Sequence, residues 1–180
     1  MPATRRLAAW TIGHSTLPIE EFLARLGSQR IEALADVRRF PGSRKHPQFN
    51  ADTLAPVLRQ SAIQYLALPE LGGRRRARPD SRNVAWRNES FRGYADYMQT
   101  EEFLQNLERL LDMARSERVA IMCAEAVPWR CHRSLIADAL LVRGVRVEEI
   151  VGAGACRLHA LTPFAKVQGT SITYPPERPD

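Results

Sequence analysis

An apolar run passes directly into a cluster of reactive side chains in the stretch Val119-Ala-Ile-Met-Cys-Ala-Glu-Ala-Val-Pro-Trp-Arg-Cys-His-Arg-Ser134. Its first four residues have the composition of a buried strand, and a helical pattern begins near Cys131. Two cysteines, a glutamate, a histidine and two arginines lie between Cys123 and Ser134. Open α/β sheets bind their ligands where a strand ends and the next helix begins. The stretch therefore predicts an α/β fold and places a functional site within it.

Strand and helix patterns alternate along the rest of the chain. Nearly continuous apolar runs, the pattern of strands covered on both faces, occupy residues 8–12, 31–37, 63–68, 119–124 and 145–151. Helical spacing of apolar residues occupies residues 18–26, 52–61, 91–98, 101–115 and 131–143. This alternation predicts a single three-layer α/β domain over residues 1–180, with a parallel or mostly parallel sheet of five strands. The proline-rich tail, residues 159–180, is expected to pack as an extended coil or a hairpin.

The composition is that of an ordinary globular protein. Of the 180 residues, 44% are hydrophobic and 26% are charged, which is close to the average for globular domains. No apolar run approaches the roughly 20 residues that a membrane-spanning helix needs, so no membrane partner is expected. Three cysteines are an odd number, which suits a reducing cytoplasm better than a disulfide framework. We therefore expect a cytoplasmic protein; the composition leaves its oligomeric state open.

The net charge of +6 is concentrated in one segment. Residues 69–92 contain seven arginines against three acidic residues. The part from Arg74 to Arg87, here called the arginine loop, has few apolar residues and no regular period. One interpretation is a loop that holds a phosphate-bearing ligand or nucleic acid, and the other is a solvated loop without a ligand. The lack of periodicity predicts mobility in the free protein, and the first interpretation adds ordering when a polyanion binds.

Polar groups follow four of the predicted strands. In a doubly wound sheet the loops after the strands meet at one edge, so groups that are far apart in sequence are expected to lie together. The four groups are Gly13-His14-Ser15, Asp36-Val37-Arg38, Glu70-Leu71-Gly72-Gly73 and Cys123-Ala124-Glu125. Their convergence predicts one site at the carboxyl edge of the sheet.

Cys123 ends the fourth predicted strand and has two interpretations. Buried cysteine is usually an inert small hydrophobe. A following helix N-terminus and nearby arginines would instead lower its pKa and make it a nucleophilic thiolate. A strand, a cysteine, a loop, an arginine and a helix follow one another in cysteine-dependent phosphatases as well. Those enzymes place five residues between the cysteine and the arginine, whereas six separate Cys123 from Arg130.

Two arginines, Arg130 and Arg133, lie at the start of the helix that follows. Cations at the positive end of a helix are mildly unfavourable. Two of them there favour a bound anion, because helix N-termini and guanidinium groups both bind phosphate. The alternative is a salt bridge to Glu125 or Asp36.

His132 is a candidate general acid or base, since the ordinary pKa of histidine is near 6.5. A histidine hydrogen-bonded to the backbone at the start of a helix fits the sequence equally well. The same two interpretations apply to His14, which lies between a predicted strand and a predicted helix.

Neither a metal nor a cofactor is predicted. Enough zinc ligands would be present in Cys123, Cys131 and His132, with Cys156 or His14. Paired Cys-x-x-Cys spacing is absent, however, and neighbouring side chains on a helix diverge by about 100°.

A glycine pair near the end of the chain, Gly152-Ala-Gly154, superficially suggests a dinucleotide-binding loop. It follows the last predicted strand rather than the first, and Arg157 stands where a third glycine is required. The expected fold is therefore Rossmann-like without the dinucleotide fingerprint.

Several short motifs occur in one order along the chain. They are Thr11-Ile-Gly-His-Ser15, Asp36-Val-Arg38 with Pro41 and Ser43, Leu71-Gly-Gly73, Phe91-Arg-Gly-Tyr-Ala95 with Met98, and Cys123-x-Glu125 with Cys131-His-Arg133. As an ordered set they resemble the domain-of-unknown-function 488 family over about Trp10 to Val151, and Thr162-Pro-Phe-Ala165 and Tyr174-Pro175 in the tail are similar too. The resemblance implies a single α/β domain and supplies no activity.

The residues predict an anion-accepting pocket and a candidate hydrolase or transferase that acts on a phosphate-bearing ligand, such as a nucleotide or a nucleic acid end. The predicted nucleophile is Cys123, the acid or base is His132 or Glu125, and Asp36 orients a partner. The predicted ligand-binding residues are His14, Ser15, Arg38, Ser43, Arg130 and Arg133. Two alternatives stay open, a non-catalytic nucleic-acid-binding module that uses the arginine loop and a metal-dependent hydrolase.

Overall fold

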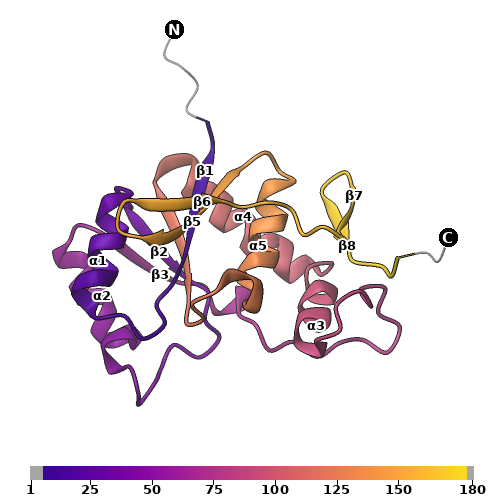
Figure 1. Ribbon diagram of the computed structural model, residues 1–180, viewed down its shortest axis with the longest axis horizontal. Helices are drawn as coiled ribbons and strands as arrows, with labels where there is room; N and C mark the ends of the chain where they lie inside the picture. The colour runs from indigo at the N-terminus through magenta and orange to yellow at the C-terminus, as the bar shows by residue number, and fades with distance from the viewer. Residues whose placement is uncertain (1–5, 178–180) are drawn as a thin grey trace, which may run out of the picture.

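A six-stranded, mostly parallel sheet forms the centre of the protein in a computed structural model, which describes residues 6–177 (Figure 1). The strands are β1 (Ala8–Gly13), β2 (Ala33–Asp36), β3 (Gln64–Ala67), β4 (Val119–Cys123), β5 (Arg146–Gly152) and β6 (Ala155–Leu158). Their order in the sheet is β3-β2-β4-β1-β5-β6. The first five strands are parallel, and β6 pairs with β5 in the antiparallel direction.

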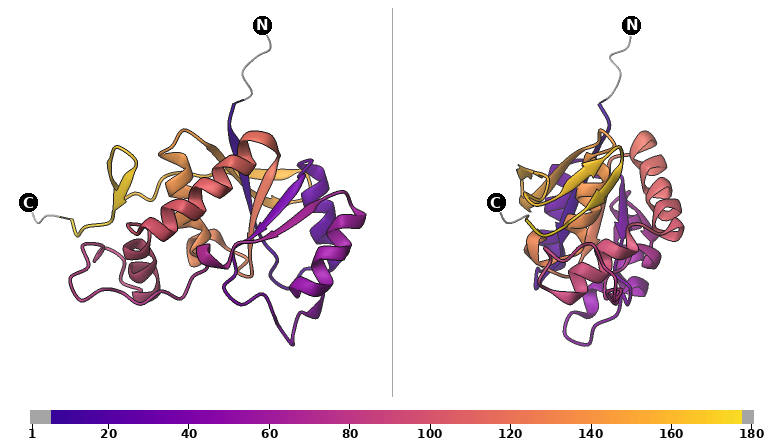
Figure 2. Two further views of the ribbon diagram at one scale, coloured as in Figure 1. Left: turned by 180° about the vertical axis from the view of Figure 1, so that it is seen from behind. Right: turned by 90° about the vertical axis from the view of Figure 1, so that its right-hand side faces the viewer.

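Helices cover both faces of this sheet, which makes three layers (Figure 2). They are α1 (Ile19–Ser28), α2 (Ala51–Gln60), α3 (Glu89–Tyr97), α4 (Glu101–Ser116) and α5 (Arg133–Leu141). Apolar side chains of α1 and α2 pack on one face and those of α4 and α5 pack on the other, where α3 lies away from the strands and extends the same apolar cluster. The Rossmann-like α/β fold expected from the sequence is confirmed.

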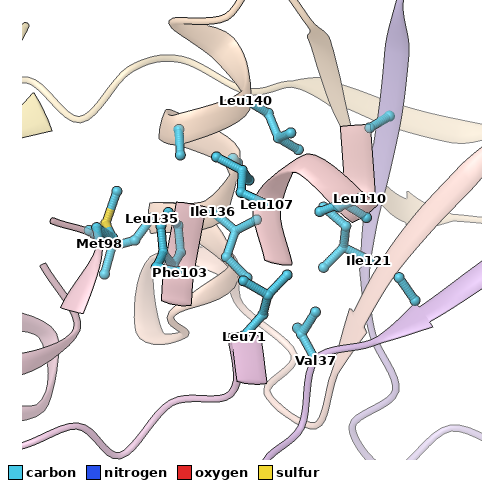
Figure 3. Packing of buried hydrophobic residues seen from close by; sticks show 14 of the residues in the cluster. Val37, Leu71, Met98, Phe103, Leu107, Leu110, Ile121, Leu135, Ile136 and Leu140 are labelled. Atoms are coloured by element: carbon cyan, nitrogen blue, oxygen red, sulfur yellow. The ribbon is translucent and has the colours of Figure 1, made fainter. Parts of the chain in front are cut away.

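The alternation of side chains along β4 divides the core between the two faces. Ile121 and Cys123 point into the cluster that α4 and α5 cover, whereas Ala120 and Met122 point into the cluster under α1 and α2. Successive residues of a strand face opposite sides of its sheet, so a strand buried on both faces is apolar throughout. Figure 3 shows Ile121 beside Leu110 of α4, in the same cluster as the leucines of α5. Cys123 thus lies on the face from which α5 starts.

The sheet has one strand more than the five that the sequence predicted. β6 was missed because it is short and mostly exposed, as an edge strand is. The Gly152-Ala-Gly154 segment forms the turn between β5 and β6, where Gly154 has a φ of +73°. Glycine adopts this left-handed conformation without steric cost, so these glycines serve a hairpin. The tail contains a second hairpin, β7 (Lys166–Gln168) with β8 (Ser171–Thr173).

The arginine loop is fastened to α3. The carboxylate of Asp96 accepts hydrogen bonds from the Arg78 backbone N–H at 2.8 Å, the Ser81 hydroxyl at 2.6 Å and the Asn83 amide at 2.8 Å. A side chain at Gly93 would come within 2.1 Å of the Arg75 carbonyl oxygen, so the loop backbone lies directly against the helix. The aperiodic sequence predicted a mobile loop because its anchors are single polar residues, which leave no periodic signal.

We expect Asp96→Ala to loosen the arginine loop. The substitution leaves donors of Ser81 and Asn83 without an acceptor, and each buried orphan donor costs about 1–3 kcal/mol. Hydrogen exchange of residues 78–83 should therefore accelerate, and the free energy of unfolding should fall by a similar amount. The matched control is Asp80→Ala in the same loop, because Asp80 forms only a solvent-exposed ion pair with Arg78. Equal effects of the two substitutions would show that Asp96 is not the anchor.

A helix that crosses a bilayer needs about 20 predominantly apolar residues. Within residues 6–177, no helix has the length and apolar character that crossing a membrane requires.

Candidate functional site

A cavity of about 440 Å³ opens at the carboxyl edge of the parallel strands, the lower edge in Figure 1. The loop after each of the first four strands contributes to its wall. These contributions include Ser15 after β1, Arg38 and Arg39 after β2, Gly73 and Arg74 after β3, and Cys123 with Glu125 at the end of β4. Segments that are far apart in sequence thus form one pocket.

The register of the strands brings these loops together. Gly13 lies opposite Cys123, and Asp36 lies opposite Met122. Beyond the strands, the Ser15 N–H donates to the Ala124 carbonyl at 3.0 Å, so the β1 and β4 loops stay paired. A Cβ atom at Gly13 would come within 1.9 Å of the Glu125 carbonyl oxygen. Only glycine permits this close approach, which places the β4 loop over the end of β1.

Cys123 lies at the base of the cavity and is in contact with Arg133, the first residue of α5. The Arg133 Nη1 donates to Cys123 Sγ at 2.8 Å and to the Glu125 carbonyl at 2.5 Å, and Nη2 donates to the Ala126 carbonyl at 3.0 Å. The Arg133 side chain is only 2% exposed and does not line the cavity. It therefore supports the sulfur and the loop from behind, which differs from the ligand-binding role predicted for it.

The surroundings of Cys123 favour its thiolate. Burial opposes ionisation, but the neighbouring Cys131 thiol and the positive charge and hydrogen bond of Arg133 outweigh it and lower the pKa of Cys123 to about 7. Cys131 behaves in the opposite way: the neighbouring Cys123 sulfur and burial raise its pKa well above the ordinary value. The surroundings of the two cysteines thus favour ionisation of Cys123 over ionisation of Cys131.

Asp36 lies behind the pocket and orients Arg38. Its two carboxylate oxygens accept from Arg38 Nε at 2.8 Å and Nη2 at 2.6 Å, and one of them also accepts from the Tyr65 hydroxyl at 2.6 Å. Such a two-point contact fixes the plane of a guanidinium group. Asp36 does not line the cavity, whereas Arg38 does. The residue that Asp36 orients is therefore Arg38.

His14 holds Arg38 from the other side. Its Nδ1 lies 2.9 Å from the Ser15 carbonyl, which can only accept, so Nδ1 carries the proton and Nε2 accepts from Arg38 Nη1 at 3.3 Å. The ring stacks on Phe49 with centroids 4.3 Å apart. Burial lowers the pKa of His14 to about 4. A neutral ring in this position orients Arg38 and does not itself line the cavity.

His132 lines the cavity, but its surroundings do not suit an acid or base. Its Nε2 donates to the Val37 carbonyl at 3.1 Å, and burial lowers its pKa to about 4. The ring is therefore neutral and tied to the backbone of the β2 loop. This was the alternative that the sequence left open for a histidine at a helix start. Glu125, which is exposed in the cavity wall, is the remaining predicted acid or base.

Ser43 lies outside the cavity wall. Its hydroxyl accepts from the backbone N–H groups of Lys45 at 3.2 Å and His46 at 3.3 Å. Serine commonly stabilises a turn in this way, and the sequence alone does not distinguish that use from ligand binding. Among the other predicted ligand-binding residues, Ser15 and Arg130 do line the cavity.

Sequence reasoning missed two arginines and two aromatic residues of the pocket as individual site residues, and one of the aromatic residues is Phe91 of α3. Arg39 and Phe40 continue the β2 loop beyond Arg38, and Arg74 begins the arginine loop. Position directly after a predicted strand end was the available signal for Arg39. Nothing in the sequence indicated that Arg74 turns back toward the pocket, where its carbonyl accepts from Arg39 Nη1 at 3.1 Å.

No set of three or more histidine, cysteine, aspartate or glutamate side chains within residues 6–177 is arranged to hold a metal ion. His132 illustrates why, since its Nε2 is engaged by a backbone carbonyl. The metal-dependent alternative therefore gains no support from the described residues.

Comparison with known proteins gives a family but no activity. A family model described as Domain of unknown function DUF488 matches residues 18–140 of the 180. The matched range includes Arg38, Cys123 and Arg133, and excludes β1 and the tail. No curated protein and no solved structure matches the chain.

Proposed function

We propose that this chain, which belongs to the family described as Domain of unknown function DUF488, is a cysteine-dependent hydrolase or transferase that acts on a phosphate-bearing ligand. One observation carries the proposal: Arg133 donates to Cys123 Sγ at 2.8 Å at the base of an arginine-lined cavity. A thiolate held by a guanidinium group and open to a cavity is equipped for nucleophilic attack.

The charges around the cavity support an anionic ligand. Four arginines line it, Arg38, Arg39, Arg74 and Arg130, against a single acidic residue, Glu125. Arg38 is paired with Asp36, but Arg39, Arg74 and Arg130 have no carboxylate partner among residues 6–177. Guanidinium groups that lack an acidic partner and converge on a cavity attract phosphate.

An aromatic ring at the mouth of the cavity favours a nucleotide over inorganic phosphate as the natural ligand. Phe40 lines the cavity and is 66% exposed. The guanidinium carbon of Arg39 lies 5.7 Å from the centroid of the Phe40 ring. Exposed aromatic rings beside arginines provide stacking surfaces for nucleobases. The ligand class that fits both features is a nucleotide or the end of a nucleic acid.

The proposed reaction proceeds in two steps. The Cys123 sulfur attacks phosphorus, an S–P bond forms, and the bond from phosphorus to the leaving oxygen breaks. Glu125 in its acid form donates the proton to that oxygen, and as a carboxylate it then takes a proton from water or an acceptor hydroxyl. The incoming oxygen breaks the S–P bond and restores the thiolate. Arg38 and Arg130 would hold the phosphoryl oxygens throughout.

This arrangement differs from the plan of cysteine-dependent phosphatases in one respect. The arginine that contacts the nucleophile, Arg133, also binds the carbonyls of Glu125 and Ala126 and is turned away from the cavity. Recognition of the phosphoryl group is therefore assigned to arginines of separate loops, chiefly Arg38 and Arg130. The pocket would bind phosphate only when those loops are in place.

We expect inorganic phosphate to protect Cys123 from alkylation by iodoacetamide, and Arg130→Ala to weaken that protection. Loss of one charge-assisted contact costs about 1.5–3 kcal/mol, so the phosphate concentration for half-protection should rise about tenfold or more. The readout is the labelling rate of Cys123 at pH 7, separated from Cys131 and Cys156 by mass spectrometry. Arg87→Ala is the control, because Arg87 belongs to the arginine loop but not to the cavity. If phosphate does not change the labelling rate of Cys123 in the unmodified protein, the cavity is not an anion site.

A second candidate function is a non-catalytic nucleic-acid-binding module. The observation that favours it is continuity: Arg74 lines the cavity, and exposed Arg76 and Arg78 follow it along the anchored loop. This function predicts that oligonucleotide binding falls steeply with salt, is weakened by Arg87→Ala, and is unaffected by Cys123→Ser. The catalytic proposal predicts instead that turnover is abolished by Cys123→Ser and is unaffected by Arg87→Ala.

A further inference from the structure

A second thiol lies in the same cavity, and the proposed reaction does not use it. Cys131 lines the cavity and is 6% exposed. Its Sγ lies 3.7 Å from Nδ1 of His132 and 3.5 Å from the backbone nitrogen of Arg133. The Arg133 side chain holds the other sulfur. One residue therefore contacts both sulfurs, with its backbone on one side and its guanidinium group on the other.

The positions of the two cysteines in the chain would let them pair without disturbing the sheet. Cys123 is the last residue of β4, and Cys131 follows the short 3-10 turn Pro128–Arg130 just before α5. The segment between them, residues 124–130, is a surface loop and contains no residue of the sheet. The loop is open to solvent at Ala124, Glu125 and Ala126. A disulfide between the two sulfurs would therefore enclose only residues 124–130 and would leave the strands in place.

We infer that Cys123 and Cys131 form a disulfide when a hydroperoxide enters the pocket, with Cys123 as the attacking sulfur and Cys131 as the resolving one. The inference rests on the proposed function in one respect, the nucleophilic character of Cys123. Redox-reactive cysteines are accessible thiolates that often lie next to a resolving cysteine. The class of oxidant is hydrogen peroxide or an organic hydroperoxide, and a small or protein dithiol would reverse the reaction.

The chemistry balances in two steps. In the first step the Cys123 thiolate attacks the terminal oxygen of the hydroperoxide, so that an S–O bond forms and the O–O bond breaks. The departing alkoxide or hydroxide takes a proton from water. The sulfur is thereby oxidised to sulfenic acid and the peroxide is reduced. Cys131 then attacks the Cys123 sulfur, an S–S bond forms, the S–O bond breaks, and hydroxide leaves with the Cys131 proton as water. Reduction by a dithiol passes two electrons back and restores both thiols.

Formation of the disulfide would inactivate the pocket reversibly and would protect Cys123 from irreversible oxidation. The disulfide removes the thiolate that accepts from Arg133 Nη1, so nucleophilic attack on a ligand stops. Sulfenic acid that is not resolved oxidises further to sulfinic acid, which is irreversible in most proteins. Cys131 would thus act as protection for Cys123. Cys156 lies on β6 and outside the cavity wall, so it takes no part.

The test is to treat the full-length protein with hydrogen peroxide at pH 7, alkylate the remaining thiols and map the peptides by mass spectrometry. We expect a linked Cys123–Cys131 peptide, an intact mass lower by two hydrogens, free Cys156, and full reversal by dithiothreitol. Cys131→Ser should instead accumulate Cys123 sulfenic acid, trapped by dimedone, and then sulfinic acid. Cys156→Ser should form the disulfide as the unmodified protein does.

Two outcomes would overturn the inference: sulfinic acid on Cys123 with Cys131 free in the unmodified protein, or a link that involves Cys156. The peptide map of the unmodified protein decides this even if Cys131→Ser does not fold. Failure here is distinguishable from failure of the proposed function. If phosphate protects Cys123 but no disulfide forms, the anion site stands and the inference is rejected. If the disulfide forms but phosphate gives no protection, the inference stands and the anion site is rejected.

Discussion

Replacing Arg133 by alanine is expected to slow the alkylation of Cys123 at pH 7 by about tenfold. Only the thiolate reacts, and once the thiol pKa lies above the pH, each further pKa unit lowers the thiolate fraction about tenfold. The guanidinium group lies 2.8 Å from the sulfur and is one of the groups that lower the pKa of Cys123 to about 7. Without it, burial would raise the pKa of Cys123 toward or above that of a free thiol, about 8.5. The measurement is the pH profile of iodoacetamide labelling, whose midpoint should move upward.

Two further variants separate this electrostatic effect from a loss of structure. Arg133→Lys keeps the charge but not the planar fork that also binds the Glu125 and Ala126 carbonyls, so its midpoint should lie between those of the unmodified protein and Arg133→Ala. Arg143→Ala removes a guanidinium group at the far end of α5, whose Nη1 contacts the Ala139 carbonyl. It should leave the midpoint where it is. An unchanged midpoint in folded Arg133→Ala would refute the role given to this arginine.

Replacing Asp138 by alanine is expected to reduce the free energy of unfolding by about 3–5 kcal/mol, the usual effect of removing one partner of a buried ion pair. Asp138 on α5 is fully buried. Its carboxylate accepts from His159 Nε2, the Tyr174 hydroxyl and the Thr162 N–H, at 2.8, 2.8 and 3.2 Å. These contacts fasten the tail to α5. Urea unfolding measures the loss, and Asp112→Ala on the exposed side of α4 is the control, with an effect under about 1 kcal/mol.

The same contacts predict how stability depends on pH. Burial alone would lower the pKa of His159, but its hydrogen bond to Asp138 and the Glu149 carboxylate 3.9 Å from its Nδ1 raise the pKa to about 9 from the ordinary 6.5. A pKa that is higher in the folded protein means that protonated His159 stabilises the fold. This contribution is complete below about pH 6.5 and disappears as the pH rises to about 9. The free energy of unfolding should fall over this interval, and fall less in Asp138→Ala; equal slopes would contradict the assignment.

Most of the fold could be predicted because buried parallel strands have a distinctive pattern. All four residues of β2 and all five of β4 are buried, and both segments are continuous apolar runs or nearly so. β6 could not be predicted in this way, since an edge strand that pairs on one side only needs no such run. Its pairing with β5 includes an irregularity between Ile150 and Gly152, which further obscures a regular alternation.

The location of the site was easier to predict than the direction of its side chains. Strand ends in a parallel sheet meet at one edge, so Ser15, Arg38 and Cys123 could be grouped from sequence. Whether an arginine at a helix start faces the cavity or the core depends on the path of the preceding loop. Arg133 turns inward because carbonyls of the β4 loop point at it, and no spacing rule encodes that.

The order of the strands has a consequence for synthesis of the protein on the ribosome. β1 is the first strand of the sheet to emerge, yet it lies between β4 and β5 and pairs with both. Until translation has passed Gly152, a nascent chain carries β1 without one or both neighbours, and an unpaired strand edge recruits other chains. A chaperone that shields extended apolar segments would therefore find its target near Ala8–Gly13. Contacts this distant in sequence also make folding slow, so we expect the sheet to close only once β5 has left the exit tunnel.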